Sequence, residues 1–295
     1  MISLVTACMN REAHLRRSLP EWLRLPGLGE IVVVDWSNER SLEELTALDP
    51  RVRVVRVQGE PRWVLSYAYN LGVARAAGSD ILKCDADCLP DPAIMALAPA
   101  DGQFFAGHWK SGQPLGKPSV NGQCVFTRRQ FETVNGYSEF IRTYGRDDED
   151  FYDRLMAAGQ ARAEINPALL NFIDHSHEAR TANQFKAEGE GIEARLRRDV
   201  VYNEMKNQFY GRALPWGSNR SRARYRTVET RGHWELVERD QTAELAIPVP
   251  VEQAARLFAV RYVTAQVLRL APQSVDRLDE RACLALLQNR LRIAA

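Results

Sequence analysis

The apolar run EIVVVD at residues 30–35 constrains the fold more than any other part of this chain. It is continuous and rich in β-branched residues, which is typical of a parallel strand buried on both faces of a sheet. Parallel strands need crossover connections, and here apolar runs alternate with segments of helical periodicity. The expected strands are residues 2–8, 30–35, 52–57 and 80–84, and the expected helices are residues 11–25, 41–48 and 65–77. The sequence therefore predicts an α/β fold with a doubly wound, mostly parallel sheet.

Composition excludes several classes of protein. The 295 residues suffice for one large domain or two moderate ones, and 45% of them are hydrophobic. The formal net charge is +1, which argues against a nucleic-acid partner. Five cysteines without a framework spacing indicate reduced thiols, and the chain shows neither a signal peptide nor a run of ~18 apolar residues. We therefore expect a cytoplasmic protein without a transmembrane segment.

The carboxyl-terminal third differs in pattern from the rest of the chain. It is more charged and has helical periodicity, strongest over residues 251–270 and 276–293. We expect a catalytic domain at residues 1–185 and a mainly helical extension at residues 186–295. The apolar stripe along residues 251–270 needs a partner surface, either the neighbouring sheet or a second copy of the chain in a homo-oligomer.

An acidic pair, Asp85 and Asp87, follows the strand at residues 80–84. Pro90 and Pro92 prevent the strand from continuing, so the pair lies where a strand ends and a loop begins. Ligands of open α/β sheets bind outside the carboxyl ends of the strands. Two carboxylates at that place are suited to hold Mn²⁺ or Mg²⁺. For an isolated pair of this kind, a solvated turn is the simpler alternative.

A second acidic cluster occupies residues 147–150, at the start of a predicted helix over residues 147–159. Negative charge at the amino end of a helix is favourable, which explains one or two of the four carboxylates. Four adjacent acids repel one another, and such a cluster is typical of a site that meets a cation, a hydroxyl or an amine. Gly145 permits a close turn before the cluster, and Tyr144 is suited to stack on a sugar ring, with an ordinary interface aromatic as the alternative.

The loops after the first two strands carry further polar residues. Thr6, Asn10 and Arg11 follow the first strand, and Asp35 ends the second. In an open α/β sheet these loops line the crevice that takes a nucleotide. For Asp35, a turn or helix-capping role is an equally good interpretation.

Two histidines, His175 and His177, follow an apolar segment at residues 168–173. Either would add an imidazole to a metal site, which favours Mn²⁺ over Mg²⁺. A surface or core histidine is the alternative. Together with the acidic pair and the acidic cluster, the histidines predict a metal-dependent enzyme that transfers a sugar from a nucleotide.

The order of these motifs resembles that of GT-A glycosyltransferases, especially the β-1,4-galactosyltransferase-like group and its family 2 relatives. The opening segment TACMNREAHL at residues 6–15 looks like the start of those enzymes. The similar motifs that follow in the same order are YNLG at 69–72, DAD at 85–87, NGY at 135–137, GRDDEDFYDRL at 145–155, and His175-Ser176. The similarity covers about residues 1–185. This chain has Tyr144 where that group has tryptophan, Arg146 where glycine is usual, and Phe172 where some members have a thioether ligand.

The resemblance implies a Rossmann-like GT-A fold and sugar transfer with inversion at the anomeric carbon. It implies a divalent metal held by Asp87 and His175, with Asp85 beside them. It also implies that Asp148 is the base that deprotonates the acceptor and that Asp147 binds acceptor hydroxyls. The implied nucleotide contacts are Thr6, Arg11 and Asp35.

The sequence thus predicts a glycosyltransferase with a nucleoside-diphosphate donor, expected to be a UDP-sugar, and a glycan or small-molecule acceptor. One alternative is a nucleotidyltransferase on a similar sheet. That class would need a basic, glycine-rich phosphate loop after the first strand, and residues 7–10 do not supply one. The other alternative is a nucleotide-sugar-binding protein without catalysis, which would have no need for the carboxylate cluster.

Overall fold

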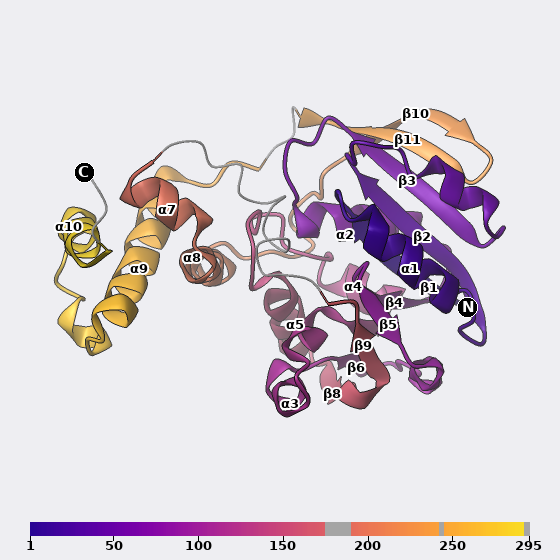
Figure 1. Cartoon of the computed structure of the whole chain (residues 1–295), viewed down its shortest axis with the longest axis horizontal. Helices are drawn as coiled ribbons and strands as arrows, with labels where there is room; N and C mark the ends of the chain where they lie inside the picture. The colour runs from indigo at the N-terminus through magenta and orange to yellow at the C-terminus, as the bar shows by residue number, and fades with distance from the viewer. Residues whose placement is uncertain (175–189, 242–244, 292–295) are drawn as a thin grey trace.

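The computed structural model describes residues 1–174, 190–241 and 245–291. Its main feature is a mixed sheet whose strands follow the order β10-β11-β3-β2-β1-β4-β7-β6-β8 (Figure 1). The strands of this sheet are β1 (Ile2–Cys8), β2 (Leu28–Trp36), β3 (Val52–Gln58), β4 (Asp80–Lys83), β6 (Gln103–Ala106), β7 (Cys124–Thr127), β8 (Ala161–Glu164), β10 (Tyr225–Arg231) and β11 (Trp234–Arg239). A small second sheet pairs β5 (Cys88–Pro90) with β9 (Leu170–Phe172).

The first four strands are parallel neighbours, as the sequence predicts. Side chains of β2 alternate between two hydrophobic clusters, with Val32 and Val34 in one and Ile31 and Val33 in the other. The helix α2 (Leu65–Arg75) covers the first cluster, and α1 (Glu12–Trp22) covers the second. The continuous apolar run therefore reflects burial on both faces of the sheet.

Beyond β4 the sheet changes direction. The strand β7 pairs antiparallel with both β4 and β6, whereas β8 is parallel to β6. The α-helices of this half are α3 (Trp109–Gly112), α4 (Arg128–Thr133) and α5 (Asp147–Ala157). Tyr137, Phe151 and Phe131 form an aromatic cluster that packs α4 and α5 against the sheet. This packing fixes the start of α5 beside the end of β4.

The carboxyl-terminal region is largely helical, and its helices are α7 (Ile192–Arg198), α8 (Val200–Ala213), α9 (Val249–Leu268) and α10 (Glu280–Leu291). Figure 1 shows α9 and α10 away from the main sheet, with α8 between them and α5. Two strands, which the sequence analysis did not predict, interrupt this region. β11 adds in parallel to β3, and β10 forms the edge of the sheet. Strand pairing therefore ties residues from this region to the first half of the chain.

The apolar stripe expected along α9 is covered in part, since Leu257 packs against the cluster shared with α7, α8 and α10 and Phe258 contacts Phe209 of α8. The buried residues of α9 include Ala259 and Val263, which pack with α7, α8 and α10, and Ala255, which packs in a separate cluster with Tyr210 of α8. Leu257, Phe258 and Tyr262, from the predicted stripe, line a separate cavity of about 580 Å³. The helix is long enough to present apolar residues on two faces, and periodicity alone does not say which face is covered.

All five cysteines are buried with free thiols, in agreement with the sequence. Among the helices of the described ranges, none combines the length and apolar character that a membrane crossing requires.

Candidate active site

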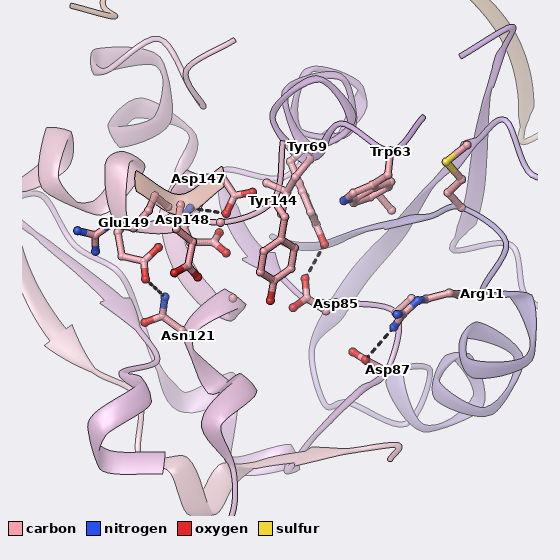
Figure 2. A pocket seen from close by; sticks show the side chains of 18 of the residues that line it. Arg11, Trp63, Tyr69, Asp85, Asp87, Asn121, Tyr144, Asp147, Asp148 and Glu149 are labelled. Atoms are coloured by element: carbon pink, nitrogen blue, oxygen red, sulfur yellow. Dashed lines mark hydrogen bonds and ion pairs between the residues drawn. The ribbon is translucent and has the colours of Figure 1, made fainter. Parts of the chain in front are cut away.

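A cavity of about 620 Å³ lies at the carboxyl ends of β1 and β4 and against the start of α5. Figure 2 shows Arg11 and Asp87 at one end, Asp147, Asp148 and Glu149 at the other, and Asp85 and Tyr144 between them. The residues that line the cavity are Ala7, Cys8, Met9, Arg11, Trp63, Leu65, Tyr69, Asp85, Ala86, Asp87, Trp109, Asn121, Gly122, Tyr144, Gly145, Arg146, Asp147, Asp148, Glu149, Glu204 and Met205. The structure thus brings the acidic pair and the acidic cluster, separated by about sixty residues of sequence, to one cavity.

The first carboxylate of the pair, Asp85, is held by three side chains. Its Oδ1 accepts hydrogen bonds from the Tyr69 hydroxyl at 3.1 Å and from Lys83 Nζ at 3.2 Å, and its Oδ2 accepts one from Gln123 Nε2 at 2.9 Å. The Asp85 backbone N–H also donates to Gln123 Oε1. The backbone at Gly122 passes so close that a Cβ there would lie 2.5 Å from Asp85 Oδ2. These contacts fix the orientation of the carboxylate in the cavity wall.

Asp87 lies opposite Arg11 at the end of the cavity nearest β1. The guanidinium Nη1 of Arg11 is 3.5 Å from Asp87 Oδ2, an ion pair rather than a short hydrogen bond. The pair is largely buried, with side-chain exposures of 19% for Arg11 and 13% for Asp87. Because Arg11 follows β1 and Asp87 follows β4, parallel pairing of these strands accounts for their meeting.

The residues present fit a divalent cation in part. Asp85 and Asp87 supply hard oxygen donors at the cavity wall, the ligand type that Mg²⁺ and Mn²⁺ prefer. Within the described ranges, no group of three or more histidine, cysteine, aspartate or glutamate side chains is placed to hold a metal. One or two carboxylates completed by substrate phosphates is the usual arrangement for Mg²⁺. His175 and His177 lie outside the described residues, so the expected imidazole ligand stays a prediction.

Asp148, which the sequence predicts as a site residue, lies in the wall of the cavity and has a perturbed carboxylate. Burial raises the pKa of Asp148 to about 6, with Lys83 opposing the rise and Asp85 and Glu149 adding to it. Its Oδ1 lies 3.1 Å from the hydroxyl of Tyr137, which donates a hydrogen bond, and 3.2 Å from Lys83 Nζ. A carboxylate with this pKa is ionised at neutral pH and still basic enough to accept a proton.

The four adjacent acids have different environments. Asp147 and Glu149 line the cavity with Asp148, and Glu149 Oε1 accepts a hydrogen bond of 2.9 Å from Asn121 Nδ2. Burial, reinforced by the charges of Asp148 and Glu149, raises the pKa of Asp147 well above its usual range. Asp150 instead forms an ion pair with Arg154, one turn along α5, at 2.8 Å. Three of the carboxylates therefore line the cavity, and the fourth stabilises α5 through an ion pair.

The loop before α5 takes an unusual backbone path. Gly145 has φ +91°, and Arg146 has φ +67° in the left-handed region. Arg146 thus stands in a conformation that favours glycine, the residue usual at this position in the galactosyltransferase-like group. A Cβ at Gly145 would lie 2.4 Å from Cγ of Glu204 on α8. Glu204 and the next residue, Met205, line the cavity, so the carboxyl-terminal region contributes to its wall.

Three of the expected nucleotide contacts are not among the residues that line the cavity. Asp35 is fully buried, and it accepts hydrogen bonds from the backbone N–H groups of Asn38 and Leu42 and from Arg56 Nη1. Contacts of this kind are expected for a residue that stabilises a turn, which is the alternative role that the sequence offers for Asp35. Thr6 is also fully buried inside β1. The side chain of Asn10 accepts a hydrogen bond from the Glu39 backbone N–H in the loop beyond β1.

Sequence reasoning missed several residues of the site. Lys83 lies within the apolar strand at residues 80–84, where a lysine is itself a signal of a buried partner of opposite charge. Tyr69 and Tyr137 stood within recognised motifs but received no role. Trp63 and Gln123 gave no signal in the sequence, because their neighbours in space are distant in the chain.

Two family models match separate parts of the chain. Residues 3–100 match the model described as glycosyl transferase family 2, and residues 110–178 match the model described as the N-terminal domain of galactosyltransferase. A comparison with curated protein sequences gives no match.

Several solved structures have a similar fold. The catalytic domain of Drosophila β-1,4-galactosyltransferase 7 in complex with xylobiose is 14% identical, with a TM-score of 0.51 over 86% of this chain and 98% of that chain. The mannosyltransferase PcManGT from Pyrobaculum calidifontis, in complex with GDP-Man and Mn²⁺, is 13% identical, with a TM-score of 0.53 over 100% of this chain and 76% of that chain. The glucosyl-3-phosphoglycerate synthase from Mycobacterium tuberculosis, in complex with Mg²⁺ and UDP, is 16% identical, with a TM-score of 0.50 over 80% of this chain and 88% of that chain. At these identities the likeness establishes the fold, and with the two family-model matches it identifies the chain as a glycosyltransferase of the GT-A type.

Proposed function

We propose that this enzyme transfers a sugar from a nucleoside diphosphate, with UDP as the nucleotide, to a hydroxyl group of an acceptor, and that it depends on Mn²⁺ or Mg²⁺ and inverts the anomeric carbon. The observation that carries the proposal is the cavity in which Asp85 and Asp87 stand at one side and Asp148 at the other. Complexes of similar folds with UDP and Mg²⁺, and with GDP-Man and Mn²⁺, support the class of donor and the cation.

The diphosphate of the donor would lie at the end of the cavity that holds Arg11 and Asp87. A divalent cation bound by Asp87 would neutralise the charge that develops on the departing diphosphate. Arg11 adds a positive charge at the same end, and Trp63 offers an aromatic face toward the middle of the cavity (Figure 2). The carboxylate of Asp85 already accepts three hydrogen bonds, so it would stand in a fixed orientation beside the cation. His175 is proposed as an additional ligand, and a weaker loss of Mn²⁺ binding in His175→Ala than in His177→Ala would reassign it.

The acceptor would enter from the end that holds Asp147, Asp148 and Glu149. Its hydroxyl oxygen attacks the anomeric carbon, the bond from that carbon to the diphosphate oxygen breaks, and the hydroxyl proton passes to Asp148. Asp147 is placed to accept hydrogen bonds from other acceptor hydroxyls, and Tyr144 to stack on a sugar ring. Attack from the face opposite the leaving group gives inversion.

A direct test measures release of the nucleoside diphosphate from a panel of nucleotide sugars, with Mn²⁺ and with EDTA. The expected result is slow, Mn²⁺-dependent hydrolysis of at least one UDP-sugar, which a suitable acceptor accelerates. Binding of UDP-sugars without release under any of these conditions would instead show a binding protein that lacks catalysis.

A further inference from the structure

A lysine ammonium is buried in the interior between the two acidic groups of the cavity. Lys83, on β4, has only 1% of its side chain exposed. Removing an ammonium from water costs several kcal/mol unless it gains partners of opposite charge. The carboxylates of Asp148 and Asp85 lie beside the Lys83 ammonium and supply these partners.

The contacts of Lys83 connect the two sides of the cavity. Its Nζ lies 3.2 Å from Oδ1 of Asp85 and 3.2 Å from Oδ1 of Asp148, and it donates a hydrogen bond to the carbonyl oxygen of Gly122. The ring of Tyr69 lies below it, with the centroid 4.4 Å from Nζ. The two carboxylates, one after β4 and one in the first turn of α5, therefore share one buried ammonium and cannot separate without breaking one of its two ion pairs.

These contacts also distinguish the two oxygens of Asp148. Oδ1 receives both the Lys83 ammonium and the Tyr137 hydroxyl. Among the described residues, no hydrogen bond to Oδ2 is found, and a Cβ at Gly122 would lie 3.5 Å from that oxygen. Two donors on one oxygen fix the rotation of a carboxylate about its last bond and leave the other oxygen to meet a hydroxyl.

We propose that Lys83 is a positioning residue, which anchors Oδ1 of Asp148 so that Oδ2 takes the acceptor proton and which sets the distance of this base from the donor end at Asp85. This inference rests on the proposed function. Lys83 does not touch the reacting atoms and acts through Asp148. A misplacement of about 1 Å in a catalytic group can cost about 10² in rate, which sets the size of the expected effect.

The test is a cycle of single and double variants, in which kcat and KM for transfer are measured with Mn²⁺ and the donor that the wild-type enzyme uses best. Lys83→Met is expected to lower kcat by about 10²-fold. In the Asp148→Asn background the same change should lower kcat by less than about threefold, because the group that Lys83 positions is already inactive. Lys117→Met, a lysine that does not line the cavity, is the control and should leave kcat unchanged.

If Lys83→Met lowers kcat by the same factor in the wild-type and in the Asp148→Asn background, the proposal is overturned. Lys83 would then have a structural role that is independent of the base. If Lys83→Met does not fold, Tyr137→Phe removes the other donor to the same oxygen and keeps the ring. Its loss of kcat must then vanish in the Asp148→Asn background, and persistence of the loss would count against the anchoring of Oδ1. The proposed function itself would be refuted by a wild-type enzyme that releases no nucleotide from any donor. The variant cycle tests only the role of Lys83.

Discussion

The side-chain amide of Asn207, on α8, donates a hydrogen bond of 2.7 Å to the carbonyl oxygen of Gly145, in the loop before α5. The same amide nitrogen also reaches the carbonyl oxygens of Thr143 and Tyr144, both at 3.1 Å. Asn207 is 1% exposed, so these bonds are made away from water. The carboxyl-terminal region, which neither family model covers, therefore holds the loop that carries Tyr144 in the wall of the cavity.

Asn207→Ala is expected to loosen this loop and raise the KM for the acceptor several-fold more than the KM for the donor. The reason is that the loop borders the acceptor end, whereas Arg11 and Asp87 stand at the other end. Asn203→Ala is the matched control, because Asn203 lies one turn earlier on α8, is equally buried, and bonds only to Arg197 and Asp199 among the described residues. Initial-rate kinetics on both variants would check this. Equal effects on the acceptor KM would assign both residues to helix stability alone.

Asp148→Asn should lower kcat by about 10²–10⁴-fold, the usual contribution of a general base. The affinity for UDP with Mn²⁺ should stay nearly unchanged, since Asp148 is at the acceptor end. Asp153→Asn, an exposed aspartate on the same helix, serves as the control. Turnover of Asp148→Asn close to wild type with a true acceptor would place the base elsewhere.

The pH dependence of transfer should follow the raised pKa of Asp148. Because burial raises this pKa to about 6 in the protein without substrate, kcat/KM is expected to fall as the pH drops through about 6, where the base becomes protonated. The linkage to folding has the opposite sign. A carboxyl with a raised pKa favours the folded state below its ordinary value of 3.8, and this contribution is lost as the pH rises through about 6. A pH–rate profile checks the first statement, and the acid limb should be absent from the residual rate of Asp148→Asn.

Asp87→Ala should abolish the part of UDP affinity that depends on a divalent ion. Without the cation, the diphosphate would face Asp85 and Asp87 as like charges. Calorimetry is expected to give tighter UDP binding in Mn²⁺ than in EDTA for the wild type, and equal binding in both for Asp87→Ala. Asp101→Ala, at a side chain that is 77% exposed, should behave like the wild type. Equal wild-type affinity in EDTA and in Mn²⁺ would refute the metal assignment.

Arg146→Gly should give a more stable protein than Arg146→Ala, by about 1 kcal/mol in the free energy of unfolding. Both variants lose the same side chain, but only glycine adopts φ +67° without a steric cost. At Met156, an exposed position inside α5, the order should reverse, with glycine about 1 kcal/mol less stable than alanine. Urea denaturation of the four variants gives the comparison. If alanine is the more stable residue at position 146 as well as at position 156, the left-handed turn at Arg146 carries no strain.

The sequence by itself determined the parallel half of the sheet and pointed to Asp85, Asp87, Asp147 and Asp148, which line the cavity. Continuous, β-branched apolar runs such as residues 30–35 are typical of strands covered on both faces, so the parallel strands followed from local pattern. Asp85 follows the end of a strand, and Asp148 stands at the start of a helix. The sequence pattern thus placed both acids at the ends of elements, where side chains reach a cleft. These features depend on a few neighbouring residues, which is why a single sequence reveals them.

Only the tertiary structure decided how these groups act on one another. Lys83 bridges Asp85 and Asp148 because the chain between them folds back as β7, and no local pattern encodes that return. The oxygens of Asp35 accept hydrogen bonds from Arg56 on β3 and from backbone N–H groups of the loop after β2, and its place outside the cavity lining became visible only in the fold. Likewise, β11 joins the sheet beside β3, and α8 reaches the loop at Gly145, across long separations in sequence. Burial and charge pairing are sums over neighbours in space, so the pKa of Asp148 and the shape of the acceptor end became defined only when distant segments met.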